Sequence, residues 1–359
     1  MNIIDYAKMF QNDSFLEKRF TIIDSVILCM FAYMNFEVVM STDWYSDKKF
    51  FIRDIKENEI NVLCADELLT RYNIKLLKAI RTSKRYGDIE VRYIRSISNI
   101  EDEMQFYALT FILPNDHPYI AFRGTDLTAL GWKENFNMCM LACTPSQVEA
   151  YKYIKDISNL VKEDFYVGGH SKGGNLAFYG GISSEKEIQD RIIYCYSFDG
   201  PGFKEKSFLT TDNFKRLETR LIQLFPLNDV VGTLLYTYDD YLVVKSKSFF
   251  VLQHNPYFWS VAKDWAFVYK KKIKTKAERR KKAFNSFISS LTDDDKNILM
   301  HAIICFLGGI DSKLGVFFKK TKFKLRYFIK VHKSFTKDER RHLRMLRKRF
   351  IHTIIKKWK

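Results

Sequence analysis

Residues 165–177 read FYVGGHSKGGNLA, which places Ser171 at the centre of a G-x-S-x-G motif directly after a short apolar run. A serine on a sharp turn from strand to helix has strained backbone geometry, so the positions two residues to either side must carry almost no side chain. Gly169 and Gly173 meet that requirement. The stretch predicts a strand, a tight turn and a helix with a nucleophile at Ser171. A merely structural glycine-rich turn is the alternative.

Strand-like apolar runs occur on both sides of this motif. They lie at residues 89–94, 104–113, 119–123, 192–198, 220–225 and 249–252. The first two predict an antiparallel hairpin, and the alternation of the later runs with helical patterns predicts a mostly parallel sheet flanked by helices. Before the sheet, residues 24–36 and 65–81 predict two helices. The predicted fold class is therefore α/β, in which ligands bind at the carboxyl ends of the strands.

The composition divides the chain into two parts. Of its 359 residues 47% are hydrophobic, which excludes a disordered protein. Residues 263–359 hold 29 Lys and Arg against 8 Asp and Glu, whereas residues 1–262 have a net charge of −4. In the basic part, Leu343, Leu346 and Phe350 share one stripe of a predicted last helix. We expect one domain at 1–262 that contains the sheet and a basic, amphipathic helical extension at 263–359.

Neither a leader segment nor a membrane span is evident. Residues 1–20 lack the basic segment followed by an apolar core that marks a secretory signal, and the longest apolar stretches fall short of the roughly 20 residues that span a bilayer. The six cysteines form no C-x-x-C pair. These features predict a cytoplasmic protein with reduced thiols, no metal site and no cofactor.

A reactive serine needs a histidine base, and the chain has seven histidines. His170 adjoins Ser171 on the turn, so its side chain is expected to point away from the hydroxyl, and His117 precedes the serine. Four others lie on the basic helices, where surface or packing roles are simplest: His301, His332, His342 and His352. His254, after the run at 249–252, is therefore the expected base. A histidine that merely ends a strand is the alternative.

In hydrolases that carry their serine on a G-x-S-x-G turn, the acid that orients the histidine lies between the serine and the histidine in the sequence. Asp229 follows the run at 220–225, and we favour it because the expected sheet order places its loop beside that of His254. Asp199 follows the run at 192–198 and is the competing candidate.

A developing oxyanion needs hydrogen-bond donors that are already aimed at it. They are usually the backbone N–H after the nucleophile and one N–H from the loop after an earlier strand. Lys172 supplies the first. The run at 119–123 opens into a Gly-Thr turn, so the backbone N–H of Thr125, with its hydroxyl as a further option, supplies the second.

These motifs resemble two families. In order along the chain, the segments FRGT (122–125), GHSKG (169–173), NDVV (228–231) and His254 with Trp259 resemble the class 3 lipases, the fungal triacylglycerol lipase type. A closer resemblance is to an uncharacterised bacterial lipase-like family that carries GWKExFN (131–137), GHSKGGNLA (169–177) and FDGPGF (198–203). The similarity extends over most of the chain.

The resemblance implies an α/β-hydrolase fold with a triad and an oxyanion hole. It assigns the triad to Ser171, Asp229 and His254 and places Thr125 at the oxyanion hole. Two positions depart from the class 3 lipases. Gly232 stands where they usually have proline, and Lys172 follows the serine where they tend to have a small or apolar residue.

The expected function is a serine ester hydrolase that acts on an acyl ester, a lipid or a lysophospholipid. An amidase or peptidase with the same triad is an alternative. The basic region 263–359 is suited to an anionic membrane surface, which would make the protein peripheral to the inner face of the membrane. It is equally suited to packing its stripe on the hydrolase core. A nucleic-acid-binding or scaffold protein with a degenerate hydrolase domain is disfavoured, because no nucleic-acid module accompanies the lysine clusters.

Overall fold

The computed structural model describes residues 1–46, 48–65, 69–126, 128–227, 231–232, 234–271, 274–306 and 332–358. Within these residues, eight strands form one sheet in which each strand lies beside the next along the chain. They are β1 (Glu90–Asn99), β2 (Met104–Ile112), β3 (Tyr119–Phe122), β4 (Phe165–His170), β5 (Ile192–Phe198), β6 (Leu221–Pro226), β7 (Leu242–Val244) and β8 (Tyr269–Lys270). β1 to β3 alternate in direction, β3 to β7 are parallel, and β8 is antiparallel to β7. The predicted α/β class with a mostly parallel sheet is confirmed.

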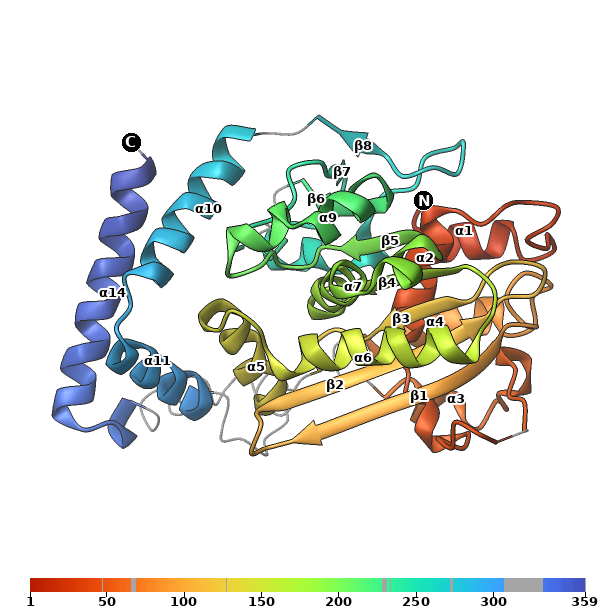
Figure 1. The fold of residues 1–359 in the computed structure, drawn as a ribbon, viewed down its shortest axis with the longest axis horizontal. Coiled ribbons are helices and arrows are strands. Elements are labelled where there is room, and N and C mark those ends of the chain that lie inside the picture. Colours follow the sequence, from red (N-terminus) through yellow and green to blue (C-terminus); the bar gives the residue numbers. More distant parts are fainter. Residues whose placement is uncertain are drawn as a thin grey trace.

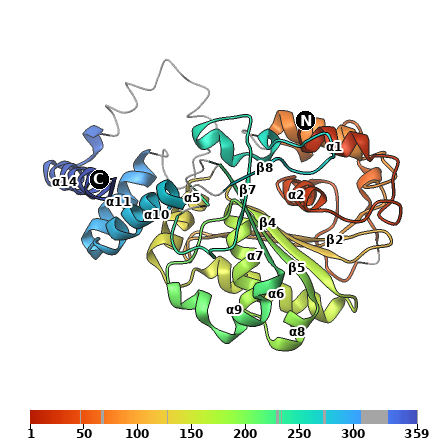
Figure 2. The same ribbon diagram turned by 90° about the horizontal axis from the view of Figure 1, so that it is seen from above.

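Helices cover both faces of this sheet (Figure 2). The α-helices are α1 (Ile3–Met9), α2 (Ile22–Phe31), α3 (Ile60–Leu63), α4 (Thr70–Ile80), α5 (Ala129–Met140), α6 (Pro145–Leu160), α7 (Lys172–Ser183), α8 (Lys186–Asp190), α9 (Asp212–Leu217), α10 (Lys274–Ser289), α11 (Asp293–Phe306) and α14 (Lys337–Trp358). The 3₁₀ helices are η1 (Phe36–Val38), η2 (Ile52–Asp54), η3 (Lys206–Thr210), η4 (Glu218–Arg220), η5 (Phe250–His254) and η6 (Pro256–Phe258).

The central strands are buried on both sides because successive residues of a strand point to opposite faces. In β3, Tyr119 and Ala121 belong to the apolar core under α1, α2 and α4, whereas Ile120 and Phe122 belong to the core under α6 and α7. Strands buried in this way need no polar face, which explains why their sequences are continuous apolar runs.

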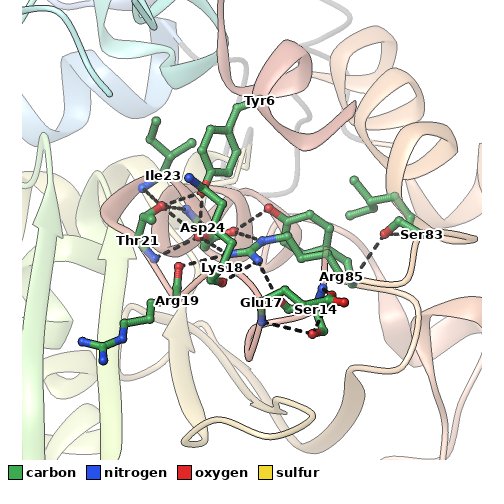
Figure 3. Close-up of polar contacts among 12 residues, drawn as sticks. Tyr6, Ser14, Glu17, Lys18, Arg19, Thr21, Ile23, Asp24, Ser83 and Arg85 are labelled. Carbon is green, nitrogen blue, oxygen red and sulfur yellow. Dashed lines mark hydrogen bonds and ion pairs between the residues drawn. The ribbon is translucent and has the colours of Figure 1, made fainter. Parts of the chain in front are cut away.

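An ion pair between Asp24 and Arg85 organises the N-terminal region (Figure 3). Both side chains are fully buried. Oδ1 of Asp24 lies 2.8 Å from Nε of Arg85 and accepts from the hydroxyl of Tyr86 at 2.6 Å. Oδ2 accepts from the hydroxyls of Thr21 at 2.8 Å and Tyr6 at 3.1 Å. The rest of the guanidinium donates to the backbone carbonyls of Ser14, Lys18 and Arg19. The network fastens the segment after α1 to α2 and to the turn that leads into β1.

Helix α7 is unusually rich in glycine. Gly173, Gly174, Gly180 and Gly181 take four of its 12 positions. A Cβ at Gly180 would overlap Cδ1 of Ile154 and press against the backbone of Ala150, both in α6, so the two helices approach each other closely at this point. Glycine lowers helix stability, and α7 therefore depends on this packing.

Helices α10, α11 and α14, which we call the tail helices, lie together at one end of the molecule, next to α5 (Figure 1). Their side chains form a small apolar core that includes Phe287 and Leu346. Cys139 and Met140, the last residues of α5, pack against this core. The tail helices are thus joined to the sheet-containing part of the molecule through α5.

A buried carboxylate also holds the tail helices together. Asp295 accepts hydrogen bonds from Nε2 of His342 at 2.6 Å and from Nη1 of Arg349 at 2.8 Å. The backbone N–H of Asp295 in turn donates to the hydroxyl of Thr292 at the start of α11. Asp295 therefore joins α11 to α14.

Two of the predicted helices and one predicted strand can be checked directly. The helices expected at 24–36 and 65–81 correspond to α2 and α4. The strand expected at 249–252 is wrong, because this segment enters the 3₁₀ helix η5. A short apolar run does not distinguish a strand from a buried helical turn. The place beside β6 is taken instead by β7.

Candidate active site

Ser171 lies on the turn between β4 and α7 with a φ of 59°. This left-handed conformation is strained for a residue with a side chain. Two glycines make the turn possible. A Cβ at Gly169 would overlap the carbonyl of Gly173, and a Cβ at Gly173 would overlap the carbonyl of Phe122. The turn therefore presents the serine at the carboxyl end of the sheet, as a nucleophile elbow does.

His254, at the end of η5, pairs with Asp199. Its Nδ1 lies 2.7 Å from Oδ2 of Asp199, so an Nδ1–H tautomer donates to the carboxylate. Asp199 follows β5 with a φ of 52° and is fully buried, whereas the side chain of His254 is 23% exposed. The acid that contacts the expected base is thus Asp199, the competing candidate. Asp229, the favoured one, lies outside the described residues.

The segment around Gly232 explains one departure from the class 3 lipases. A Cβ at this position would overlap Oδ1 of Asp199 and the ring of Phe225. The backbone here approaches the acid so closely that a proline ring would not fit without a shift.

His170 supports the loop that carries His254. Its Nε2 lies 2.8 Å from the backbone carbonyl of His254, and because a carbonyl only accepts, Nε2 carries the proton. Its Nδ1 then accepts from the hydroxyl of Tyr33 at 2.9 Å. Burial, and secondarily the neighbouring His254, lower the pKa of His170 well below its usual 6.5. His170 is therefore uncharged and connects the turn after β4 to the loop that carries His254. The sequence did not predict this role.

The expected base and nucleophile are not hydrogen-bonded to each other in the described residues. No such bond joins the hydroxyl of Ser171 to His254. The contact between nucleophile and base is often looser before substrate binds, and the placement of both residues around His170 leaves them on the same edge of the sheet.

Two backbone N–H groups that the sequence predicts at the oxyanion hole, those of Lys172 and Thr125, have no acceptor within the described residues. Lys172 is the first residue of α7, and the first N–H groups of a helix have no acceptor within it. Within the described residues, the N–H of Thr125 also donates to no acceptor. The hydroxyl of Thr125, in contrast, donates to Oδ1 of Asn135 at 2.7 Å, so it is engaged with α5.

The side chain of Lys172 is buried, and nothing in the sequence predicts this burial. Its Nζ lies 2.6 Å from Oε2 of Glu134 and 2.7 Å from Oε1 of Gln105, and it also donates to the backbone carbonyl of Gln105. Glu134 is itself fully buried on α5. Glu134 belongs to the motif at 131–137, but nothing in the sequence indicates which cation its carboxylate pairs with.

Neither a metal centre nor a membrane span is found in the described part of the chain. No three His, Cys, Asp or Glu side chains converge there as metal ligands would. None of the described helices combines the length and the apolar character needed to cross a bilayer.

Comparison with known proteins identifies one matching family. Residues 80–304 match the Mbeg1-like family, a lipase-like family. The match extends from the end of α4 into α11 and includes Ser171, His254 and Asp199. Together with the mostly parallel sheet it is compatible with an α/β-hydrolase. No curated protein matches the chain.

Proposed function

The chain belongs to the Mbeg1-like family, a lipase-like family, and from this premise we propose that it is a serine hydrolase that cleaves acyl esters. The hydrogen bond between His254 and Asp199 carries the proposal. A buried carboxylate that orients a partly exposed imidazole, on the same sheet edge as a serine on a strained turn, is the arrangement that activates a hydroxyl.

In the proposed reaction the hydroxyl of Ser171 attacks the ester carbonyl while Nε2 of His254 takes its proton. The N–H groups of Thr125 and Lys172 bind the oxyanion of the tetrahedral intermediate. His254 then donates the proton to the departing alcohol, which leaves an acyl-enzyme at Ser171. Water, deprotonated by His254, releases the carboxylic acid and restores the serine. Asp199 holds the imidazole and stabilises its charged form.

Labelling and turnover of a soluble ester test the nucleophile. We expect a fluorophosphonate to modify Ser171 and a short p-nitrophenyl ester to be hydrolysed by the wild type. Ser171→Ala should abolish both and leave the far-ultraviolet circular dichroism unchanged. Full turnover by Ser171→Ala would exclude the mechanism.

The acid is tested by comparing two isosteric variants. Asp199→Asn should lower kcat by about 10⁴-fold, as loss of the orienting acid does in serine hydrolases. Asp229→Asn should leave kcat within a few-fold of the wild type. The reverse result would return the role of the acid to Asp229.

The proposed substrates are esters rather than amides, and lipids or lysophospholipids in particular. The lipase-like family supports this choice. Matched ester and amide substrates with the same acyl chain distinguish the two chemistries. Faster release from the amide would favour the amidase or peptidase alternative.

We further propose that α14 brings the enzyme to an anionic membrane. Its outward surface carries Arg341, Arg344, Arg347 and Lys348, and none of these forms an ion pair with a described residue. Met345 and Ile351 are 50% and 46% exposed beside them. Basic side chains contribute roughly 1 kcal/mol each near an anionic leaflet, and exposed apolar side chains insert between lipids. This mixture favours a lipid surface over nucleic acid.

Vesicle binding tests this surface independently of catalysis. The full-length Ser171→Ala protein should bind vesicles that contain phosphatidylglycerol and not vesicles of phosphatidylcholine alone. Arg344→Glu with Lys348→Glu should abolish binding, whereas the matched pair Lys48→Glu with Lys49→Glu, on a distant exposed loop, should not. Stronger binding to duplex DNA than to the vesicles would favour the nucleic-acid alternative.

A further inference from the structure

Two neighbouring residues of α5 contact the two segments that flank Ser171. Oδ1 of Asn135 accepts from the hydroxyl of Thr125 at 2.7 Å, and Oε2 of Glu134 pairs with Nζ of Lys172 at 2.6 Å. Thr125 lies on the loop after β3, and Lys172 is the residue after the serine. One turn of one helix therefore holds both backbone segments from which oxyanion donors are expected.

Two effects make the position of the Lys172 side chain unfavourable for the stability of the fold. Lys172 begins α7, and a cation at a helix N-terminus is unfavourable because the N-terminal end of a helix carries partial positive charge. Burying an ammonium is more unfavourable still. Glu134 and Gln105 offset both effects by taking all the hydrogen bonds that the ammonium donates. The ammonium is consequently occupied and does not serve as a ligand for substrate.

Other contacts keep α5 in place relative to these segments. The carboxylate of Asp126 accepts from the backbone N–H and the hydroxyl of Thr128, which caps the start of α5. The backbone N–H of Gln105, on β2, donates to Oε2 of Glu134 at 3.2 Å. The helix is thus fixed both to the loop after β3 and to the sheet.

We propose that Glu134 and Asn135 are positioning residues for the oxyanion hole. They fix the separation between the N–H groups of Thr125 and Lys172, and they touch neither the substrate nor the reacting atoms. The inference rests on the proposed hydrolase function. Oxyanion donors act mainly on the transition state, so a change in their separation lowers kcat and leaves KM nearly unchanged.

The first test replaces Glu134 and uses the N-terminal ion pair as a matched control. Glu134→Gln keeps the volume of the side chain and removes its charge. With a short p-nitrophenyl ester, we expect kcat to fall about 10- to 100-fold at unchanged KM, in the range that small misplacements of catalytic groups produce. Asp24→Asn breaks an equally buried ion pair far from the serine. It should lower the melting temperature and leave kcat unchanged below that temperature.

The second test addresses the Asn135 contact and does not depend on the stability of Glu134→Gln. Thr125→Val removes the hydroxyl at similar volume and keeps the backbone N–H, whereas Thr125→Ser keeps both. We expect Thr125→Val to lose kcat about tenfold and Thr125→Ser to retain it, since only the serine can donate to Asn135.

The outcomes separate the two proposals. If the folded wild type neither turns over esters nor reacts with a fluorophosphonate at Ser171, the hydrolase proposal fails. If the wild type is active and both Glu134→Gln and Thr125→Val keep full kcat, the positioning role is overturned while the hydrolase proposal stands. Equal losses of kcat in Glu134→Gln and Asp24→Asn would also overturn it, because they would reflect general destabilisation.

Discussion

The Asp24–Arg85 and Glu134–Lys172 ion pairs are buried to the same degree, yet their surroundings differ. Around Asp24, both carboxylate oxygens accept hydrogen bonds from several donors. Around Glu134, Oε2 takes every hydrogen bond, and Oε1 accepts none from a described residue. Both carboxylate oxygens of Asp24 are therefore hydrogen-bonded, and we call this network complete. The network around Glu134, beside the serine, is incomplete because one carboxylate oxygen accepts no hydrogen bond from a described residue.

This difference indicates what each pair is for. A buried polar network contributes most to stability when all its members are satisfied, and a partly satisfied one is expensive to keep. Such exceptions concentrate at functional sites. We therefore assign the N-terminal pair to the stability of the fold and the pair on α5 to the geometry of the site.

The largest effect on stability is expected at the complete network. Asp24→Ala leaves a buried guanidinium and two tyrosine hydroxyls without their acceptor, and we expect the free energy of unfolding to fall by about 3–5 kcal/mol. Urea unfolding followed by tryptophan fluorescence measures this loss. A loss below about 1 kcal/mol would mean that the network is not a major stabilising feature.

Replacing both members of each ion pair should show a further difference between the two pairs in how much stability is recovered. Replacing Glu134 and Lys172 by Leu and Met removes both charges, so we expect most of the stability lost in either single variant to return. The same replacement at Asp24 and Arg85 should recover less, because three hydroxyls and three carbonyls lose their partners there. At the other site only the polar groups of Gln105 do so. Thermal unfolding of the four single and two double variants tests this contrast. Equal recovery at both sites would contradict it.

A smaller effect on stability is expected from the protonation of His170, which a pH titration measures. The pKa of His170 is lowered in the folded protein, so as pH falls below about 6.5 the unfolded chain takes up a proton that the folded one does not. Stability is therefore lost on acidification, by at most about 1.4 kcal/mol per pH unit, and this contribution is absent well above pH 6.5.

Comparison with His170→Gln isolates that contribution from the other titrating groups. The wild type should lose more stability than the variant between pH 7.5 and 5.5. If the two lose the same amount, His170 is protonated as readily in the folded as in the unfolded protein.

The smallest effect is expected at a surface pair. Lys186 and Asp190 form an ion pair on α8 that is more than half exposed on both side chains. Solvent screens such pairs, so Asp190→Asn should change neither the melting temperature nor kcat measurably. A clear loss would show that burial is not what distinguishes the two internal pairs from a surface pair.

The sequence predicts well those features that depend on local spacing. Glycines two residues either side of Ser171 require a tight turn, and continuous apolar runs require a sheet covered on both faces. The order of serine, acid and histidine along the chain makes His254 the expected base, and this assignment stays a prediction. These inferences use only neighbours along the chain and the general order of the triad.

The sequence does not predict features that depend on contacts between distant segments of the chain. Asp199 and Asp229 both follow strands and both precede His254, and only the three-dimensional arrangement shows that Asp199 meets the imidazole. The ion pair of Lys172 joins residues that are 38 positions apart. The contact of His170 with the carbonyl of His254 spans 84 positions. No periodicity encodes such pairings.

The glycine content of α7 has a consequence for how the chain folds. Each glycine in a helix lowers its stability by about 1 kcal/mol relative to alanine, so α7 with four of them should not form by itself. It becomes helical only once α6 and the sheet are present to pack against it. The turn that holds Ser171 begins this helix, so a chain that is still being synthesised, or is partly folded, lacks the strained turn at the serine. If the chain is the proposed hydrolase, a partly folded chain does not hydrolyse esters, because activity requires α7 to have packed.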